Sequence, residues 1–201
     1  MIAIINYNAG NIASVQNALS TLNIPFCISN TAEELCDEKI THIIFPGVGH
    51  ADHAMKELKK TDLIPTIINT KKPFLGICLG MQILGKHSEE GNTESLNIFD
   101  FPVKKFQSDK EPIPHMGWNS ISWEKDSPLF KNIDKNTDFY FVHSYYVPLL
   151  STSVEHSIAE CNYIQPFSAA IQKDNFFAVQ FHPEKSGQQG LHVLKNFYNY
   201  I

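Results

Sequence analysis

The first half of the chain alternates two kinds of hydrophobic pattern. Short continuous apolar runs of strand length occur at 2–5, 25–28, 41–45 and 73–77. Segments whose apolar residues recur every three or four positions lie at 12–22, 32–36, 51–60 and 63–70, and they predict helices. Asn11 directly precedes the first of these, where a helix N-cap is expected. Strands that alternate with helices over short connections indicate a parallel sheet covered by helices on both faces.

The pattern changes after residue 98. Short runs rich in β-branched and aromatic residues follow one another at 101–106, 115–123, 138–147, 156–163, 167–173 and 176–182. An amphipathic helix is predicted at 191–201, and the polar stretch 88–96 is expected to be a surface loop. No repeat or linker interrupts the chain. We therefore expect one α/β domain over 1–201, with a mostly parallel central sheet, flanking helices and a β-rich C-terminal half.

Composition narrows the functional classes. The formal net charge is −5, and all 16 basic residues are lysines, so arginine forks for phosphate or nucleic-acid recognition are missing. No apolar run is long enough to cross a membrane, and the opening MIAIINYNAG lacks the basic flank of a signal peptide. The four cysteines show no metal-binding or disulfide-like spacing. A cytoplasmic protein that binds neither nucleic acid nor membrane is expected.

The segment FLGICLGMQ, residues 74–82, carries the first candidate for chemistry. Gly76-Ile77-Cys78-Leu79-Gly80 follows an apolar strand and precedes a helical run, which is the pattern of a nucleophile elbow with sulfur in place of oxygen. A helix that begins near Leu79 would favour the thiolate, and the Leu79 N–H would be placed to stabilise an oxyanion. A small buried cysteine with glycines at packing points is the alternative.

A candidate base lies in AVQFHPEKSG, residues 178–187. His182 is expected at the end of a strand, on the same face as Gln180, and Glu184 follows across the rigid Pro183. A carboxylate there would hold the second imidazole nitrogen and fix the tautomer. A strand-end histidine with a solvated glutamate is the alternative for either residue alone. The combination of this pair with the Cys78 elbow favours catalysis.

Other motifs carry weaker signals. Gly47 and Gly49 in FPGVGHA follow a strand, so this loop, with Val48, would expose backbone N–H groups beside Cys78. His50 and His53 lack a third ligand nearby, and no metal site is predicted. His143 is interpreted as a core histidine, and His115 as facing either a partner or solvent.

The chain resembles the class I (triad) glutamine amidotransferases. Segments that carry the resemblance are PGVG (46–49), AMKEL (54–58), PFLGICLGMQ (73–82), SEEG (88–91), PHMGWN (114–119), FYFVHSYYV (139–147) and QFHPEKSGQQG (180–190). The GxCxG and HPE motifs are shared by all triad amidotransferases. PHMGWN together with HPEKSG is narrower and is similar to the glutaminase subunits of imidazole glycerol phosphate synthase.

The resemblance implies a role for each matching residue. Cys78 is the nucleophile, His182 the general base and acid, and Glu184 the residue that orients His182. Gln82 and the backbone around His143, Ser144 and Tyr145 bind L-glutamine, and the Gly47–Gly49 loop supplies an oxyanion donor. Residues that map onto the partner face are Asn11, Trp118, Asn119 and Lys185. No cofactor is expected.

The partner implied by the resemblance is a (β/α)8-barrel cyclase subunit in a heterodimer. That subunit uses ammonia and a bis-phosphorylated ribulosyl substrate (PRFAR) to make imidazole glycerol phosphate and AICAR in histidine biosynthesis. Two segments depart from the family pattern: Asn6-Tyr7-Asn8 stands for Asp-Tyr-Gly, and Ser95-Leu96-Asn97 for Gly-Leu-Gly. Asparagine tolerates the positive φ that glycine adopts, so Asn8 is compatible with the same turn.

Three other functions compete with this interpretation. One is the glutaminase of a related amidotransferase with another acceptor, such as a nucleotide sugar, against which only the PHMGWN-type interface argues. A cysteine peptidase would share the elbow but has no need of the HSY segment or His-Pro-Glu. A scaffold subunit with a dead site would lack Cys78, His182 or Glu184, and all three are present.

Overall fold

The computed structural model describes residues 1–7 and 11–200. Its first half contains β1 (Ile2–Ile5), α1 (Ile12–Thr21), β2 (Phe26–Ser29), α2 (Ala32–Cys36), β3 (His42–Gly47), α3 (Ala51–Lys59), α4 (Leu63–Asn69) and β4 (Phe74–Cys78). Each of these elements coincides with a predicted strand or helix to within a few residues. The alternation of the two hydrophobic periods was therefore sufficient to locate them.

The second half is mostly strands. It contains α5 (Leu79–Gln82), β5 (His87–Ser88), β6 (Thr93–Glu94), β7 (Pro102–Lys105), β8 (His115–Ser122), η1 (Pro128–Phe130), β9 (Asp138–His143), β10 (Tyr145–Tyr146), α6 (Ser151–Val154), β11 (Ser157–Tyr163), β12 (Gln165–Lys173), β13 (Phe176–Val179), η2 (Pro183–Lys185) and α7 (Gly187–Tyr198). The α/β class and the β-rich C-terminal half are confirmed.

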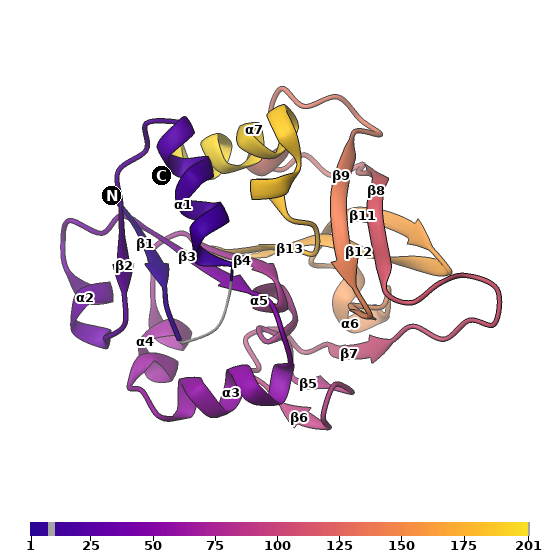
Figure 1. The fold of residues 1–201 in the computed structure, drawn as a ribbon, viewed down its shortest axis with the longest axis horizontal. Helices are drawn as coiled ribbons and strands as arrows, with labels where there is room; N and C mark the ends of the chain where they lie inside the picture. The colour runs from indigo at the N-terminus through magenta and orange to yellow at the C-terminus, as the bar shows by residue number, and fades with distance from the viewer. Residues whose placement is uncertain (8–10, 201) are drawn as a thin grey trace.

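A mixed sheet forms the centre of the fold, with the strand order β2-β1-β3-β4-β13-β12-β11-β8-β9 (Figure 1). The pairs from β2 to β13 are parallel, and the pairs from β13 to β9 are antiparallel. In the parallel part, Gly47 at the end of β3 pairs with Cys78 at the end of β4. This register places the Gly47 loop and the cysteine at the same edge of the sheet.

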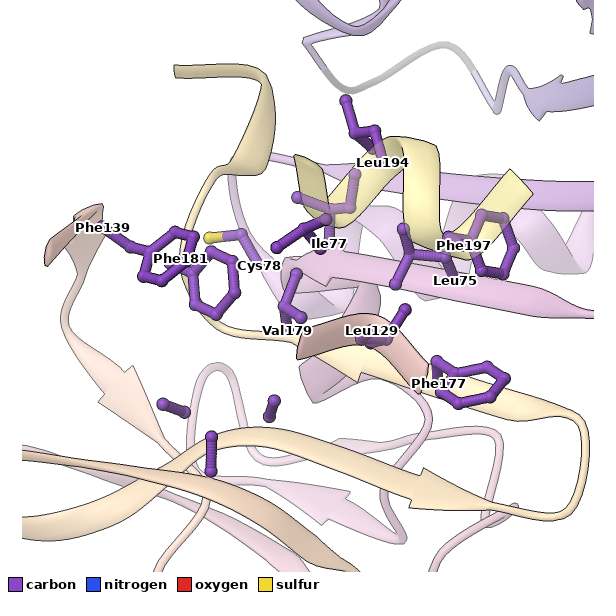
Figure 2. Close-up of a cluster of buried hydrophobic side chains, with 14 of the residues drawn as sticks. Leu75, Ile77, Cys78, Leu129, Phe139, Phe177, Val179, Phe181, Leu194 and Phe197 are labelled. Carbon is purple, nitrogen blue, oxygen red and sulfur yellow. The ribbon is translucent and has the colours of Figure 1, made fainter. Parts of the chain in front are cut away.

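Two hydrophobic cores cover the two faces of the parallel strands. One contains Ile2, Ile4 and residues of α1 and α7, and the other contains Ala3, Ile5 and residues of α3, α4 and α5, in agreement with the positions of these helices in Figure 1. Figure 2 shows part of the first core, where Cys78 lies beside Phe181 at the end of the packed side chains. The nucleophile candidate is therefore held by core packing on one side.

A few predictions differ from the structure. The stretch 88–96 is not only a surface loop: it forms β6 and part of β5 in a small four-stranded sheet, and Leu96 is buried. The last helix begins four residues before the predicted start of 191, at Gly187. Asn11 occupies the N-cap of α1, but its Oδ1 accepts the Ser14 hydroxyl rather than a backbone N–H.

The two departures from the family pattern have different outcomes. Asn97 adopts a φ of 53°, so asparagine occupies a left-handed position where the family has glycine. Asn8 lies outside the described residues. Among the helices that the structure describes, none combines the length and apolarity needed to span a membrane.

Candidate active site

Cys78 lies on a sharp turn between strand and helix. It is the last residue of β4 and the N-cap of α5, and its backbone has φ 55° and ψ −109°. A non-glycine residue rarely adopts a positive φ, and such strain concentrates at functional sites. Helix α5 comprises only Leu79–Gln82. The contribution of a helix dipole to a thiolate is therefore smaller than the sequence pattern suggested, and backbone N–H groups near the turn matter more.

The flanking glycines are required by close backbone contacts. A Cβ on Gly80 would overlap the carbonyl oxygen of Phe45 in the neighbouring strand. A Cβ on Gly76 would lie 2.7 Å from the carbonyl oxygen of Gly80. Because no real Cβ approaches an oxygen so closely, α5 can pack against β3 and β4 only without these side chains.

His182 and Glu184 are held together by the turn of η2. The Nδ1 atom of His182 lies 2.7 Å from Oε1 of Glu184, and each side chain is only 1% exposed. The strand β13 ends at Val179, three residues before the predicted end at His182. His182 is instead fixed by its main chain, because its N–H donates to the carbonyl of Tyr140 and its carbonyl accepts the Ser186 hydroxyl.

The charge of the site favours a protonated imidazole. Burial alone lowers the pKa of His182, but the negative charge of nearby Cys78, followed by the hydrogen bond and charge of Glu184, outweighs burial and raises it to about 10. The Nε2 atom of His182 is buried and has no hydrogen-bond partner among the described residues. A proton at this nitrogen is therefore available to a molecule bound beside the sulfur.

Gln180 is a neighbour of the sulfur to which the sequence motifs assigned no role. Its Nε2 lies 3.6 Å from the Sγ of Cys78, and its side chain is fully buried. The carbonyl oxygen of Val142 lies 3.8 Å from the same sulfur. A neutral amide donor stabilises a thiolate without adding charge. The alternation of side chains expected at 178–182 could have indicated this contact, because it placed Gln180 on the same face as His182.

A cavity of about 320 Å³ opens in front of Cys78. This volume is at the small end of ligand pockets and suits a molecule the size of an amino acid. The lining residues come from several separate segments: Val48, Gly49, Cys78, Leu79, Gln82, Glu90, Pro114, Val142, His143, Ser144 and Tyr145. The structure thus brings together the predicted nucleophile, the predicted substrate-binding residues and two residues of the Gly47–Gly49 loop.

Gln82 is held in one orientation within this cavity. Its Nε2 donates to the carbonyl of Tyr145 at 2.9 Å and to Oε1 of Gln180 at 2.9 Å. Both amide protons are therefore used within the protein. Only Oε1 of Gln82 remains to contact a ligand, and it acts as an acceptor.

Glu90 lines the cavity without having been assigned an individual role from the sequence, although it belongs to the SEEG motif. It is the single carboxylate among the described residues that line the cavity. Its Oε2 accepts the N–H of Ala51 at 2.7 Å, at the first turn of α3. Burial raises the pKa of Glu90, and the hydrogen bond from Ala51 opposes this rise. The second carboxylate oxygen is not used in that bond.

The predicted partner-face residues gather on one side of the molecule. Trp118 is 57% exposed and packs its ring edge-on against Tyr140, with 6.1 Å between centroids. The ammonium of exposed Lys185 lies 6.0 Å from the centre of the same Tyr140 ring. Asn11 is the N-cap of α1, which packs against η2. Asn119 differs from this group, because its amide points to the interior and contacts His115.

His115 does not face a partner or solvent, so that expectation from the sequence is wrong. It is 3% exposed and lies in the aromatic interior formed by β8, β9 and β11. His143 is buried, as expected of a core histidine. Within residues 1–7 and 11–200, no three histidine, cysteine or acidic side chains cluster as metal ligands would.

Comparison with known proteins shows the family to which the chain belongs. The family model described as "Glutamine amidotransferase class-I" matches residues 3–200. An imidazole glycerol phosphate synthase subunit HisH from Bacteroides fragilis strain YCH46 is 50% identical over 198 residues, covering 98% of this chain and 97% of the relative. The subunit HisH of Bacteroides thetaiotaomicron is 48% identical over 198 residues, with the same coverage.

Solved structures show the same fold at much lower identity. PurLQS from Thermotoga maritima has a TM-score of 0.74 at 17% identity, covering 99% of this chain and 97% of that chain. A glutamine amidotransferase, also from Thermotoga maritima, has a TM-score of 0.63 at 17% identity, covering 98% of this chain and 82% of that chain. The chain therefore belongs to the class-I glutamine amidotransferases and, within them, to the HisH subunits of imidazole glycerol phosphate synthase.

Proposed function

We propose that this chain hydrolyses L-glutamine to glutamate and ammonia through a thioester on Cys78. The observation that carries the proposal is the buried pair of His182 and Glu184, 2.7 Å apart, near a cysteine on a strained turn. The Nε2 of His182 has no hydrogen-bond partner among the described residues, and the pKa of His182 is raised. Cysteine, base and orienting carboxylate are the parts that nucleophilic acyl transfer requires. A cavity of about 320 Å³ beside the sulfur is suited to a substrate of this size.

The first half of the reaction forms the thioester. The Cys78 thiolate attacks the side-chain amide carbon of glutamine, and the C–N bond breaks as the proton on His182 Nε2 passes to the departing nitrogen. Glu184 stabilises the imidazolium before this transfer and holds the tautomer that keeps Nε2 directed away from the carboxylate. Gln180, 3.6 Å from the sulfur, stabilises the thiolate.

The second half releases glutamate. Neutral His182 takes a proton from water, which attacks the thioester carbon, and the sulfur leaves as thiolate. Negative charge develops on the carbonyl oxygen in both halves. We assign its stabilisation to the backbone N–H of Leu79 and to the Gly47–Gly49 loop, since Leu79, Val48 and Gly49 all line the cavity.

The cavity also offers groups for the polar ends of glutamine. We assign the α-ammonium to Glu90, which is the carboxylate that lines the cavity and whose Oε1 is not used in the bond to Ala51. Gln82 Oε1 provides a neutral acceptor, because its amide protons are occupied. The backbone of His143, Ser144 and Tyr145 forms the remaining wall.

The ammonia acceptor follows from the family. We propose a heterodimer with the (β/α)8-barrel cyclase subunit of imidazole glycerol phosphate synthase, which would convert PRFAR to imidazole glycerol phosphate and AICAR in histidine biosynthesis. Exposed Trp118 and Lys185 around Tyr140 form a surface suited to this contact. A shielded route between the subunits would keep ammonia from protonation by water. The four free thiols suit a cytoplasmic location.

The decisive test is Cys78→Ser measured as glutamate release in the complex with the cyclase. We expect loss of glutamine hydrolysis with the circular dichroism spectrum unchanged, since the hydroxyl fits the space of the thiol. Retained hydrolysis in this variant would refute the thioester mechanism. The isolated chain is expected to be a slow glutaminase that the liganded cyclase accelerates.

A further inference from the structure

A chain of hydrogen bonds joins two buried histidines to the wall of the glutamine cavity. His143 Nδ1 lies 2.7 Å from the carbonyl oxygen of Tyr145, and His143 Nε2 lies 3.0 Å from Nδ1 of His115. His115 Nε2 in turn lies 3.2 Å from Nδ2 of Asn119. All four ring nitrogens therefore have a partner, and none of them faces the cavity as a free group.

The ends of this chain determine the position of every proton in it. The Tyr145 carbonyl can only accept, so His143 Nδ1 carries the proton and neutral His143 accepts at Nε2. His115 must then donate from Nδ1 and accept at Nε2. The amide of Asn119 supplies that last donor.

Asn119 itself cannot reverse its orientation. Its Oδ1 accepts the backbone N–H of Ser120 at 2.9 Å, and its Nδ2 also donates to the carbonyl of Asn162 at 3.1 Å. Turning the amide over would place Oδ1 against the carbonyl oxygen of Asn162 and Nδ2 against the N–H of Ser120. Main-chain groups at both ends thus fix the direction of every hydrogen bond in this series.

The surroundings favour uncharged imidazoles. The His115 ring stacks on Tyr163 with 4.0 Å between centroids and on Phe141 with 4.9 Å. Burial lowers the pKa of His115 to about 4. Burial lowers the pKa of His143 to about 3; the hydrogen bond to Tyr145 opposes this, and the nearby His115 and His182 add to the lowering. A proton added to either ring would place two donors against each other.

The Tyr145 carbonyl connects this chain to the reacting sulfur. It accepts both the proton of His143 and one proton of Gln82, whose second proton goes to Gln180. Gln180 then contacts the Cys78 sulfur. The position of the Tyr145 carbonyl therefore affects which way Gln82 and Gln180 present their oxygens.

We propose that His115 and His143 are positioning residues for glutamine binding, which act as a neutral, one-directional pair that holds the Tyr145 carbonyl and, through it, the orientation of Gln82. This role rests on the proposed glutaminase function. It also gives Asn119 a function inside the protein, because Asn119 sets the direction of the pair. Reversal of the pair would turn a lone pair of His143 Nδ1 toward the Tyr145 carbonyl oxygen, and the repulsion would move the carbonyl that accepts a proton of Gln82.

The first test observes the protons directly, without any assay of activity. Long-range ¹H–¹⁵N spectra of the full-length chain should show both histidines as Nδ1–H tautomers, which is the less common form in water, unchanged from pH 8 to pH 5. His115→Phe assigns the signals. Asn119→Asp replaces the donor by an acceptor, so His115 should gain a proton and titrate within this range. An Nε2–H tautomer at His143, or titration of either ring near pH 6.5 in the unaltered chain, would overturn the proposal.

The second test measures glutamine hydrolysis in the complex with the cyclase. His115→Phe keeps the stacking but removes the donor to His143, and we expect KM for glutamine to rise about tenfold, with kcat changed less than about threefold. His42→Phe is the control, because His42 is also buried with both ring nitrogens bonded but lies at the start of β3.

The outcomes separate the two proposals. An unchanged KM in His115→Phe, or an equal rise in His42→Phe, would refute the positioning role while leaving the glutaminase intact. If the unaltered complex hydrolyses no glutamine, the proposed function fails, and the tautomers still decide whether the directional pair exists.

Discussion

Oε1 of Glu184 lies 2.7 Å from Nδ1 of His182, and the two residues, whose side chains are both buried, are separated by a single proline at the start of a 3-10 turn. The proposed base and its proposed orienting carboxylate thus come from one short segment, while the proposed nucleophile, Cys78, ends a strand far earlier in the sequence. The Tyr140 carbonyl and the Ser186 hydroxyl fix the main chain of this turn. Small movements of the turn would therefore move both groups together relative to Cys78.

Glu184→Gln tests the charge of this pair. The amide keeps the shape of the side chain but not its negative charge, so the pKa of His182 should fall and the imidazolium should be less stabilised. We expect kcat for glutamine hydrolysis to decrease about 10²- to 10⁴-fold, with KM within about threefold. The control is Glu160→Gln on the exposed side of β11, which should retain wild-type kinetics. A decrease below tenfold in Glu184→Gln would argue against its role.

Glu90→Gln tests recognition of the α-ammonium. The variant can still accept the Ala51 N–H but presents no charge to the substrate, so KM should rise about 10- to 100-fold while kcat changes little. Steady-state kinetics with glutamine measures this. Glu94→Gln, four residues further on and exposed in β6, is the matched control. If both variants bind glutamine as the unaltered chain does, another group must hold the ammonium.

Because His115 and His143 are buried, we expect the protein to lose stability in acid. Their folded pKa values, about 4 for His115 and about 3 for His143, lie below the value near 6.5 of an unfolded chain. As the pH falls from 6.5 to 4, the unfolded state gains protons that the native state does not, so the free energy of unfolding decreases. Each histidine contributes a slope of up to about 1.4 kcal/mol per pH unit.

Urea unfolding between pH 4.5 and pH 6.5 measures this slope. His115→Phe should reduce it by up to about 1.4 kcal/mol per pH unit. Removal of the surface residue His53 by His53→Phe should retain the slope of the unaltered chain. Equal slopes in all three proteins would mean that folding does not lower the pKa of His115.

Trp118→Ala tests the partner surface. Trp118 is 57% exposed, and large exposed aromatic side chains commonly dominate binding energy. We expect the Kd for the cyclase subunit to rise about 10- to 100-fold by isothermal titration calorimetry, with thermal stability unchanged. Ile28→Ala, at the other end of the sheet on β2 and 43% exposed, should bind as tightly as the unaltered chain. Unchanged binding by Trp118→Ala would place the interface elsewhere.

The sequence by itself determined the elements of the first half and pointed to the residues of the proposed site. Helical and strand periods depend on neighbours only a few positions apart, so β1 to β4 could be located from the chain alone. Gly76-Ile77-Cys78-Leu79-Gly80 and His182-Pro183-Glu184 are local for the same reason. The polar stretch 88–96 could not be interpreted in this way, because its two-residue strands are too short to show a period, and β5, which pairs with β6, is joined to the small sheet through β7.

The tertiary structure alone decided which distant groups meet. Gln82 contacts Gln180 across 98 residues, and His115 contacts His143 across 28. The parallel register places the end of β3 beside Cys78, and the antiparallel register pairs His115 with His143 on β8 and β9. No local pattern encodes such a register, because it results from the packing of whole strands against both cores. Short motifs were therefore enough to propose the residues of the site, whereas the contacts between Gln82 and Gln180 and between His115 and His143 depend on the folded sheet.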